Sequence, residues 1–319
     1  MVRLSAPDRR ATIFNLSPGV HMLSGVHVLL SYTCLYECDH CFLYCSPRAQ
    51  GTFTLIQVRE LLEQSKALGT VEWIFYEGGE PLLFYPLLVE SIRLTRELGF
   101  QVGVVTNAYQ TTSVEDARLW LKPLVDAGLN SLSISNDDFH AEDFRSGPAA
   151  MALEAAAAFG LNSGAIAIDR PCLKENTVEI ERGKPVEGGD TLFKGRAADT
   201  LTADLPRRPT ASFNTCPHEE LVNPERIHVD AGGEVHICQG ISIGNVWLNP
   251  LAEVMKSYDP ETHPIVGPLT RGGPARLLQE MKIQLADEFV DECHCCFVTR
   301  RKLLDQYPQV LRPELVYGR

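Results

Sequence analysis

The chain lacks any hydrophobic run that approaches the roughly 20 consecutive apolar residues of a membrane-spanning helix. Its opening segment, MVRLSAPDRR, contains no apolar core of the kind found in secretory signal peptides. Internal repeats and low-complexity tracts are also missing. From these absences we expect a cytoplasmic protein without a membrane span.

Positive charge is scarce, because the 319 residues include 29 lysines and arginines against 41 aspartates and glutamates, a formal net charge of -12. A nucleic-acid partner needs a concentrated basic face, and only short basic spots such as Arg207-Arg208 and Arg300-Arg301-Lys302 are present. No basic amphipathic helix or lipid anchor indicates membrane binding. The 45% hydrophobic content is enough for one large domain and a small second one.

Cysteine, in contrast, is abundant, and ten cysteines in a cytosolic chain favour metal or redox chemistry over disulfides. Cys34, Cys38 and Cys41 stand close together. Three thiolates at this spacing can hold one face of an iron-sulfur cluster but leave one iron open, and an open metal position is typical of a catalytic site. A zinc site with His40 or Cys45 as fourth ligand, or a disulfide framework, is the alternative at this point.

A second motif, Gly78-Gly79-Glu80-Pro81, follows a predicted strand. Two glycines let the backbone approach a ligand closely, and the Glu80 carboxylate or the strand-end carbonyls can accept hydrogen bonds from an ammonium group. Together with the cysteine triplet, this element resembles the radical S-adenosylmethionine (SAM) enzymes. The resemblance implies a 4Fe-4S cluster whose open iron is chelated by SAM, a flavodoxin- or ferredoxin-type electron donor, and a 5′-deoxyadenosyl radical that abstracts a substrate hydrogen.

The fold class follows from apolar runs that alternate with helical patterns, which is typical of βα units around a parallel sheet. Helices are predicted to begin at the Thr54/Gln57 capping box, at Pro86, at Ser113 and at Pro148. Strands are predicted near 26–31, 72–76, 101–105, 130–135, 164–168 and, weakly, 191–194. We therefore predict an α/β protein with an open partial (β/α)6 barrel over residues 1–199, whose site lies at the strand C-terminal ends.

Further cofactor-binding residues are implied by the same resemblance. Asn107 follows the third strand, where the family usually has Thr-Asn-Gly, and this chain has alanine in place of the glycine. Ser133 and Ser135 share one face of the fourth strand and could contact the SAM ribose. Arg196, after the sixth predicted strand, could reach a carboxylate or the adenine. A turn role for Asn107 and a structural ion pair for Arg196 are the alternatives.

Residues 200–319 hold five more cysteines and resemble the auxiliary-cluster extensions called SPASM or twitch domains, through segments Gly233–Cys238 and Ile243–Val246. The resemblance is partial, and the cysteine number fits a single auxiliary 4Fe-4S cluster better than two. The proposed ligands, which include a Cys-x-x-Cys pair, are Cys216, Cys238, Cys293 and Cys296. Cys295 is then left over.

A spare thiol beside a cluster can return a hydrogen atom to a carbon radical, and Cys295 and Cys172 are the two candidates. Family members with auxiliary clusters commonly modify ribosomal peptides, so we favour peptide epimerisation. The alternatives are dehydrogenation or thioether or carbon-carbon crosslinking of a peptide or small molecule, and more remotely a non-catalytic electron carrier. About 25 residues precede the first predicted strand, too few for a fused winged-helix module that grips a leader peptide. A free cysteine can also be a small buried hydrophobe.

Overall fold

The computed structural model describes residues 23–140, 147–173, 186–187 and 191–319. Its main element is a curved sheet of eight strands in the order β11-β10-β9-β1-β2-β3-β4-β5. The N-terminal strands of this sheet are β1 (Gly25–Ser31), β2 (Trp73–Gly78), β3 (Gln101–Thr106), β4 (Ser131–Ser135) and β5 (Asn162–Ile166). Neighbouring strands from β1 to β5 are parallel, as the alternating pattern predicts.

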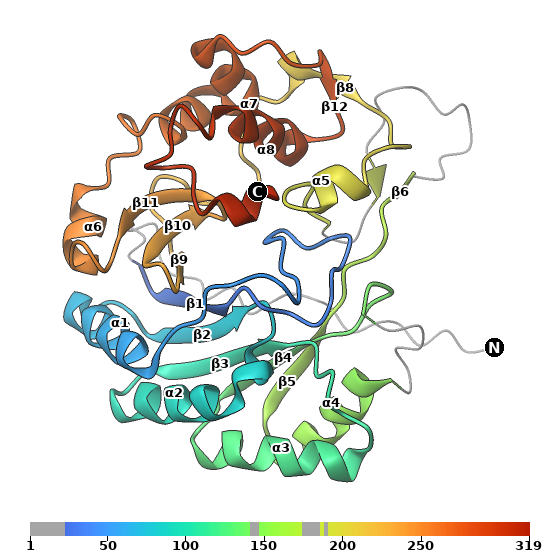
Figure 1. Ribbon diagram of the computed structural model, residues 1–319, viewed down its shortest axis with the longest axis vertical. Helices are drawn as coiled ribbons and strands as arrows, with labels where there is room; N and C mark the ends of the chain where they lie inside the picture. The colour runs from blue at the N-terminus through green and yellow to red at the C-terminus, as the bar shows by residue number, and fades with distance from the viewer. Residues whose placement is uncertain (1–22, 141–146, 174–185, 188–190) are drawn as a thin grey trace, which may run out of the picture.

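Four helices connect these strands and cover the outer face of the sheet in Figure 1: α1 (Leu55–Leu68), α2 (Tyr85–Glu97), α3 (Val114–Asp126) and α4 (Pro148–Ala158). The predicted start signals are confirmed. Thr54 and Gln57 form the reciprocal capping box of α1, and the Ser113 side chain accepts from the Asp116 N–H at the start of α3. A short 3-10 helix, η1 (Pro81–Phe84), lies between β2 and α2.

The predicted sixth strand, at residues 191–194, does not form. The Thr191 hydroxyl donates to the Asp169 carbonyl, and the Lys194 N–H turns back to the Leu192 carbonyl at 2.7 Å. Phe193 and Lys194 are both buried. Tertiary contacts of these side chains thus replace strand pairing, and the barrel has five strands of its own rather than six.

The C-terminal half extends the sheet on the opposite side, because β9 (Arg226–Asp230) pairs in parallel with β1. The hairpin of β10 (Glu234–Cys238) and β11 (Ile241–Asn245) follows, antiparallel to β9. Figure 1 shows the last helices above this part of the sheet. The remaining elements are β6 (Cys172–Leu173), β7 (Val186–Glu187), α5 (Ala197–Thr200), β8 (Arg208–Pro209), η2 (Thr210–Ser212), α6 (Leu251–Ser257), α7 (Val266–Met281), β12 (Glu288–Phe289), α8 (Glu292–Leu303) and η3 (Glu314–Tyr317).

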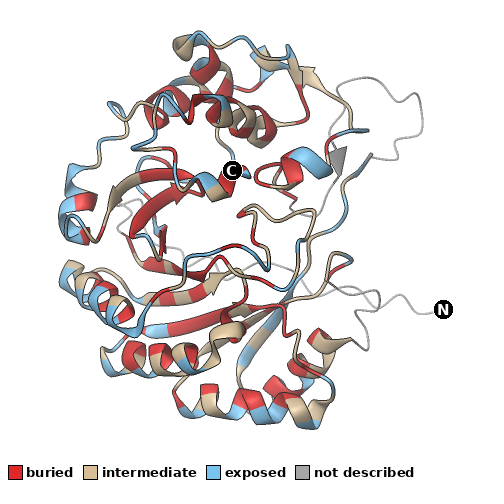
Figure 2. Cartoon of the chain, viewed as in Figure 1, coloured by how far each residue is buried: buried red, intermediate tan, exposed pale blue. Residues whose placement is uncertain are grey.

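Two large apolar cores stabilise this arrangement. One lies between the sheet and helices α1 to α4, with residues such as Val28, Ile74 and Leu121. The other packs the loop after β1 against the C-terminal half and includes Leu43 and Phe297. Figure 2 shows buried residues on both sides of the sheet. The loop after β1 is therefore fixed by packing from both halves of the chain. None of the described helices has the length and apolar character needed to cross a membrane.

Candidate functional site

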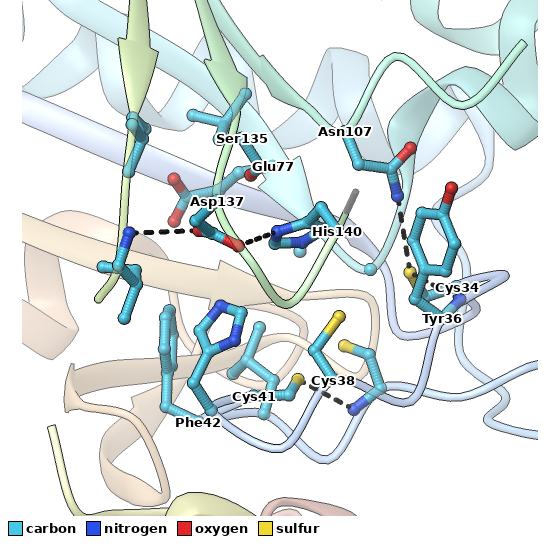
Figure 3. A pocket seen from close by; sticks show the side chains of 18 of the residues that line it. Cys34, Tyr36, Cys38, Cys41, Phe42, Glu77, Asn107, Ser135, Asp137 and His140 are labelled. Carbon is cyan, nitrogen blue, oxygen red and sulfur yellow. Dashed lines mark hydrogen bonds and ion pairs between the residues drawn. The ribbon is translucent and has the colours of Figure 1, made fainter. Parts of the chain in front are cut away.

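A cavity of about 300 Å³ opens at the C-terminal ends of β1 to β5. This is the end of a parallel barrel where active sites are found. The cysteine-rich loop after β1 supplies one wall, and the ends of β2, β3, β4 and β5 supply the others (Figure 3). Its lining includes Cys34, Tyr36, Cys38, His40, Cys41, Phe42, Cys45, Glu77, Gly78, Gly79, Asn107, Ser135, Asp137, His140, Ile166, Ile168 and Leu192.

The three motif cysteines lie together on the loop wall, and all are free thiols. Burial raises the pKa of Cys34 to about 11 and that of Cys38 to about 12. The hydrogen bond with the Cys45 thiol lowers the pKa of Cys41 to about 6. Without metal the first two thiols are protonated at neutral pH, so that binding of a metal ion or cluster must release protons.

Cys45 is a cavity residue that sequence reasoning treated as a small buried hydrophobe or a zinc ligand. It is 2% exposed, and its backbone N–H donates to the Cys41 Sγ at 3.3 Å. The hydrogen bond to Cys41 raises the pKa of the Cys45 thiol. Cys45 is therefore a protonated neighbour that supports Cys41. Its position four residues beyond Cys41 in the sequence is the only signal of this contact.

The two glycines hold the β2 turn directly against the cysteine loop. The Gly79 N–H donates to the Ser31 carbonyl at 2.6 Å, and the next N–H, of Glu80, donates to the Thr33 carbonyl at 2.9 Å. A Cβ atom on Gly79 would lie 2.2 Å from the Thr33 oxygen, and one on Gly78 would lie 2.5 Å from the Ser31 oxygen. Only glycine allows this approach, so the motif fixes the turn relative to Cys34.

The prediction that Glu80 faces a ligand needs correction, because its carboxylate is buried behind the cavity wall. It is 0% exposed and accepts hydrogen bonds from the Thr106 hydroxyl at 2.7 Å, the Asn107 N–H at 2.8 Å and the Leu82 N–H at 2.9 Å. Burial raises its pKa. Pro81 begins η1 and is buried as well. Neither residue lines the cavity, and both support the turn from behind.

Asn107 and Ser135 do line the cavity, whereas Ser133 does not. The Asn107 side chain donates toward the Cys34 Sγ at 3.8 Å, and its oxygen accepts from the Tyr109 N–H at 3.0 Å. Figure 3 shows Ser135 and Asn107 on the strand side of the cavity, across from the cysteines. Of the two β4 serines, the one nearer the strand end is the one that faces the cavity.

Arg196 holds the cysteine loop from outside the cavity instead of contacting a ligand. Its guanidinium donates to the Cys38 carbonyl at 2.9 Å and to the Cys45 carbonyl at 2.8 Å. Its backbone N–H donates to the Cys41 carbonyl at 2.9 Å. Arg196 does not belong to the cavity lining. The predicted reach toward a cofactor is thus replaced by three hydrogen bonds that position the motif.

Two acidic residues also line the cavity: Asp137, which the sequence offers as a substrate contact or as part of an exposed polar loop, and Glu77, which was given no role. Asp137 accepts from the His140 ring at 2.7 Å and from the Ile168 N–H at 3.0 Å. Glu77 lies 3.2 Å from both His27 and His228. Burial opposes ionisation of Glu77, but these histidines hold its pKa well below the usual value. Their place at strand ends is the signal that could have identified them.

The atoms of His27, Glu77 and His228 lie close enough to hold a metal ion. The neighbouring Gln239 argues against one. Its oxygen accepts from Lys194 Nζ at 2.7 Å, so its amide N–H₂ faces His228 Nε2 at 3.3 Å. A cation at His228 Nε2 would meet these hydrogens. We interpret this group as a buried polar cluster in which Glu77 pairs with His27 and His228 accepts from Gln239.

A second, much smaller cavity of about 20 Å³ lies in the C-terminal half. Four cysteines line it together, from the loop before β9, the end of β10 and the first turns of α8: Cys216, Cys238, Cys293 and Cys296. Burial raises the pKa of Cys216 to about 12 and raises that of Cys293 and Cys296. These are the four residues that the sequence groups as one ligand set.

Two buried cations beside the four thiols were missed by sequence reasoning. Lys194 and Arg300 line the same cavity and are 3% and 1% exposed. Lys194 Nζ lies 3.7 Å from the Cys238 Sγ and 3.1 Å from a Glu219 oxygen. Arg300 is part of the sequence's basic spot, but its position on α8 turns it inward, whereas Arg301 pairs with Asp199 at the surface.

The two candidate hydrogen donors lie outside both thiol cavities. Cys295 is 0% exposed and packs with Phe213, Leu278 and Phe289 in a small apolar cluster. Its thiol is thus sealed from both cavities by apolar side chains. Cys172 is exposed on the β6 strand, four residues beyond the cavity residue Ile168.

A partial β/α barrel with three clustered thiols and a glycine turn at its strand ends defines an enzyme class that uses an iron-sulfur cluster with an open iron. Residues 28–159 match the family model described as the Radical SAM superfamily. This segment of the chain is therefore similar to a radical SAM domain. Such a domain implies SAM and one 4Fe-4S cluster.

Similar proteins come from curated sequences and solved structures. YydG of Bacillus subtilis (strain 168), named as a peptide biosynthesis protein, is 26% identical over 116 residues, and the match covers 36% of each chain. The matched segment thus spans about a third of that relative. The structure of anSMEcpe with AdoMet and a peptide has a TM-score of 0.48 at 13% identity and covers 90% of this chain and 97% of that one. BtrN with AdoMet and 2-DOIA has a TM-score of 0.46 at 16% identity, covering 73% and 82%. We draw no functional conclusion from these two structural similarities.

Proposed function

We propose that this protein binds a 4Fe-4S cluster through Cys34, Cys38 and Cys41 and cleaves SAM reductively in the cavity beside them. The observation that carries the proposal is the convergence of three thiols and the Gly78–Gly79 turn on one cavity of about 300 Å³. When bound, the cluster and SAM would supply an electron and a 5′-deoxyadenosyl radical. A non-catalytic electron carrier would need neither the glycine turn nor this open space.

Other residues of the chain would bind and orient the ligand. Asn107 and Ser135 offer polar groups across from the thiols. Ile166, which is 38% exposed, continues the apolar wall with Ile168 and Leu192. An apolar wall beside a few polar groups is typical of a site that binds an organic substrate and excludes water from it.

We propose a ribosomally made peptide as the substrate, and a flavodoxin- or ferredoxin-type protein as the electron donor in the cytoplasm. The name of the Bacillus relative, which assigns that protein to peptide biosynthesis, supports the peptide. A small-molecule substrate is the alternative. The ten free cysteines suit a reducing compartment.

Epimerisation needs a thiol that returns hydrogen to the substrate radical. Because Cys295 is sealed in an apolar cluster, Cys172 is the donor that this hypothesis retains. Its backbone lies opposite Glu187 in the antiparallel pairing of β6 with β7. In the sequence, Cys172 stands between two segments that line the cavity, at Ile166–Ile168 and Thr191–Leu192. A substrate bound at this side of the cavity would place Cys172 near its reacting carbon.

Dehydrogenation or crosslinking is the second candidate, and the four-thiol cavity favours it. We propose that residues 200–319 form a SPASM- or twitch-like module whose auxiliary 4Fe-4S cluster is held by Cys216, Cys238, Cys293 and Cys296. The donor set fits such a cluster, since four thiols line one small cavity together with two buried cations. A fully ligated cluster can take an electron from a substrate radical without binding the substrate.

Anaerobic reconstitution tests both levels of the proposal. Protein loaded with iron and sulfide receives SAM and dithionite, and 5′-deoxyadenosine is measured. Absence of 5′-deoxyadenosine from the cluster-loaded wild type would refute SAM cleavage. With a short peptide encoded beside the gene, in heavy water, epimerisation predicts gain of one deuterium, whereas dehydrogenation or crosslinking predicts loss of two hydrogens.

A further inference from the structure

Arg300 is a buried cation for which the described residues offer no carboxylate partner. Its Cζ lies 5.9 Å from the ring centre of Phe297 and 5.5 Å from that of Tyr317. One terminal nitrogen donates to the Gln239 carbonyl at 3.0 Å and to the Tyr317 hydroxyl at 3.2 Å. The Nε atom is buried without a hydrogen-bond partner. Burial of a charge is strongly unfavourable unless an opposite charge lies close to it.

The four-thiol cavity is where that opposite charge can reside. Arg300 lines this cavity together with the four thiols. Protonated thiols carry no charge, whereas thiolates that bind a metal cluster do. A 4Fe-4S cluster with four thiolate ligands keeps a net negative charge in both of its common oxidation states. The buried guanidinium is therefore complementary to the loaded site and not to the empty one.

Lys194, the second buried cation, differs because it is already neutralised. Its Nζ lies 3.1 Å from Glu219, and Glu219 also lies 3.7 Å from Arg226. Lys194 and Glu219 together add little net charge at the cavity. Arg300 thus supplies the uncompensated positive charge on the four thiols.

We propose that Arg300 raises the reduction potential of an auxiliary cluster held by the four thiols and so makes this cluster a one-electron acceptor. The proposal rests on the second cluster of the proposed function. One electron converts the oxidised cluster core to its reduced form, and no bond breaks and no proton moves. The added electron makes the site more negative, so a fixed positive charge beside it stabilises the reduced form more than the oxidised form.

An electron acceptor has a consequence for the reaction. In dehydrogenation or crosslinking the substrate radical loses one electron and one proton, and a second cluster can accept that electron, whereas epimerisation is redox-neutral overall. A raised potential at the four-thiol site therefore favours the oxidative candidate over the epimerase. Arg300 acts only through the positive charge that it places beside the cluster, and it is a positioning residue in this sense.

The test is a redox titration of full-length protein in which Cys34, Cys38 and Cys41 are replaced by alanine, so that only the auxiliary cluster gives a signal. The reduced cluster is followed by electron paramagnetic resonance. Arg300→Met should lower the reduced-to-oxidised ratio at the parent midpoint at least tenfold, which is about 59 mV for a one-electron couple. Arg300→Lys should stay nearer the parent. Glu219→Gln should raise the ratio, because it leaves Lys194 uncompensated.

Arg301→Met is the matched control, since Arg301 is the next residue on α8 but pairs with Asp199 at the surface. The midpoint potential of the cluster in this variant should not change. Unchanged midpoints in both Arg300→Met and Glu219→Gln would overturn the role of Arg300. If Arg300→Met fails to fold or to bind the cluster, a raised midpoint in Glu219→Gln still shows that positive charge beside the cluster raises its reduction potential. A parent protein that binds no cluster would instead refute the second cluster of the proposed function.

Discussion

The two thiol sites differ in size and in the charges around them. The first combines three motif cysteines with a cavity of about 300 Å³, and the carboxylates of Glu77 and Asp137 line it. The second surrounds about 20 Å³ with four cysteines, and beside them Lys194 pairs with Glu219 while Arg300 has no carboxylate partner among the described residues. An incomplete ligand set beside a large cavity suits a metal site that binds substrate, and a complete set around a small cavity suits one that does not.

The difference in charge points the same way. A buried cation without a carboxylate partner, such as Arg300, stabilises the reduced form of a cluster and raises its potential. A low-potential first site is suited to give an electron to SAM, and a higher-potential second site is suited to receive one. The predictions below either remove one side of this comparison or make it sharper.

The largest effect is expected when one of the three motif cysteines is replaced. Cys38→Ser should reduce 5′-deoxyadenosine formation by about a thousandfold or more, since the cluster loses one of only three protein ligands. Iron content should fall by about half. Cys45→Ser is the control, because Cys45 neighbours Cys41 without belonging to the proposed ligand set, and it should keep both iron and most activity. Equal loss in the two variants would contradict the assignment of ligands.

A second variant tests the turn that fixes the open site. Gly79→Ala places a Cβ 2.2 Å from the Thr33 carbonyl oxygen, so we expect a loss of about 3 kcal/mol of stability and weaker SAM binding. Gly164→Ala is the matched control, since no atom lies within 4 Å of its Cβ position. Thermal unfolding and SAM binding by calorimetry measure both. Similar unfolding temperatures for the two variants would show that the close approach is not essential.

The third prediction concerns pH and the C-terminal half alone. Burial lowers the pKa of His263, whose Nδ1 accepts from the N–H groups of Ile265 and Val266 at the start of α7. The unfolded chain therefore binds more protons below about pH 6.5, and stability present above that pH is lost as the pH falls. We expect a loss of about 1 to 2 kcal/mol on acidification of the apoprotein. Denaturant titrations at several pH values, with His263→Gln, measure it, and an identical pH dependence in the variant would contradict this assignment.

The smallest effect is expected at the leftover cysteine. Cys295→Ala should keep the iron of both sites and any hydrogen transfer, because Cys295 faces neither cavity. It should cost about 1 kcal/mol through lost packing with Phe213 and Phe289. Cys238→Ala, in comparison, should lose about four iron atoms while SAM cleavage persists. Loss of iron in Cys295→Ala would show instead that Cys295 is a cluster ligand.

Local signals predicted much of this molecule. The capping box of Thr54 and Gln57 and the cap of Ser113 fix helix starts through short-range hydrogen bonds, which a sequence displays directly. The grouping of the three motif cysteines could be predicted because the spacing alone determines it. The grouping of the four distant cysteines was also predicted, but only through resemblance to a family.

Other features depend on contacts between distant segments and could not be predicted. Glu80 reads as a ligand contact, yet Thr106 and the Asn107 N–H, on the next strand, turn it inward. Residues 191–194 have strand-like composition, but Lys194 is drawn to Gln239 and Glu219. Arg300 and Arg301 are equivalent in the sequence, and only the packing of α8 separates a buried charge from an exposed one.

One measurement tests most directly whether the site of the three motif cysteines binds SAM and the site of the four C-terminal cysteines does not. The reduced, fully loaded protein is examined by electron paramagnetic resonance before and after SAM is added, together with two variants that each lack one ligand set. The account predicts that SAM changes the signal of the cluster at Cys34, Cys38 and Cys41 and leaves the signal of the other cluster unchanged. A change confined to the cluster at the four C-terminal cysteines, or a change at neither cluster, would contradict it.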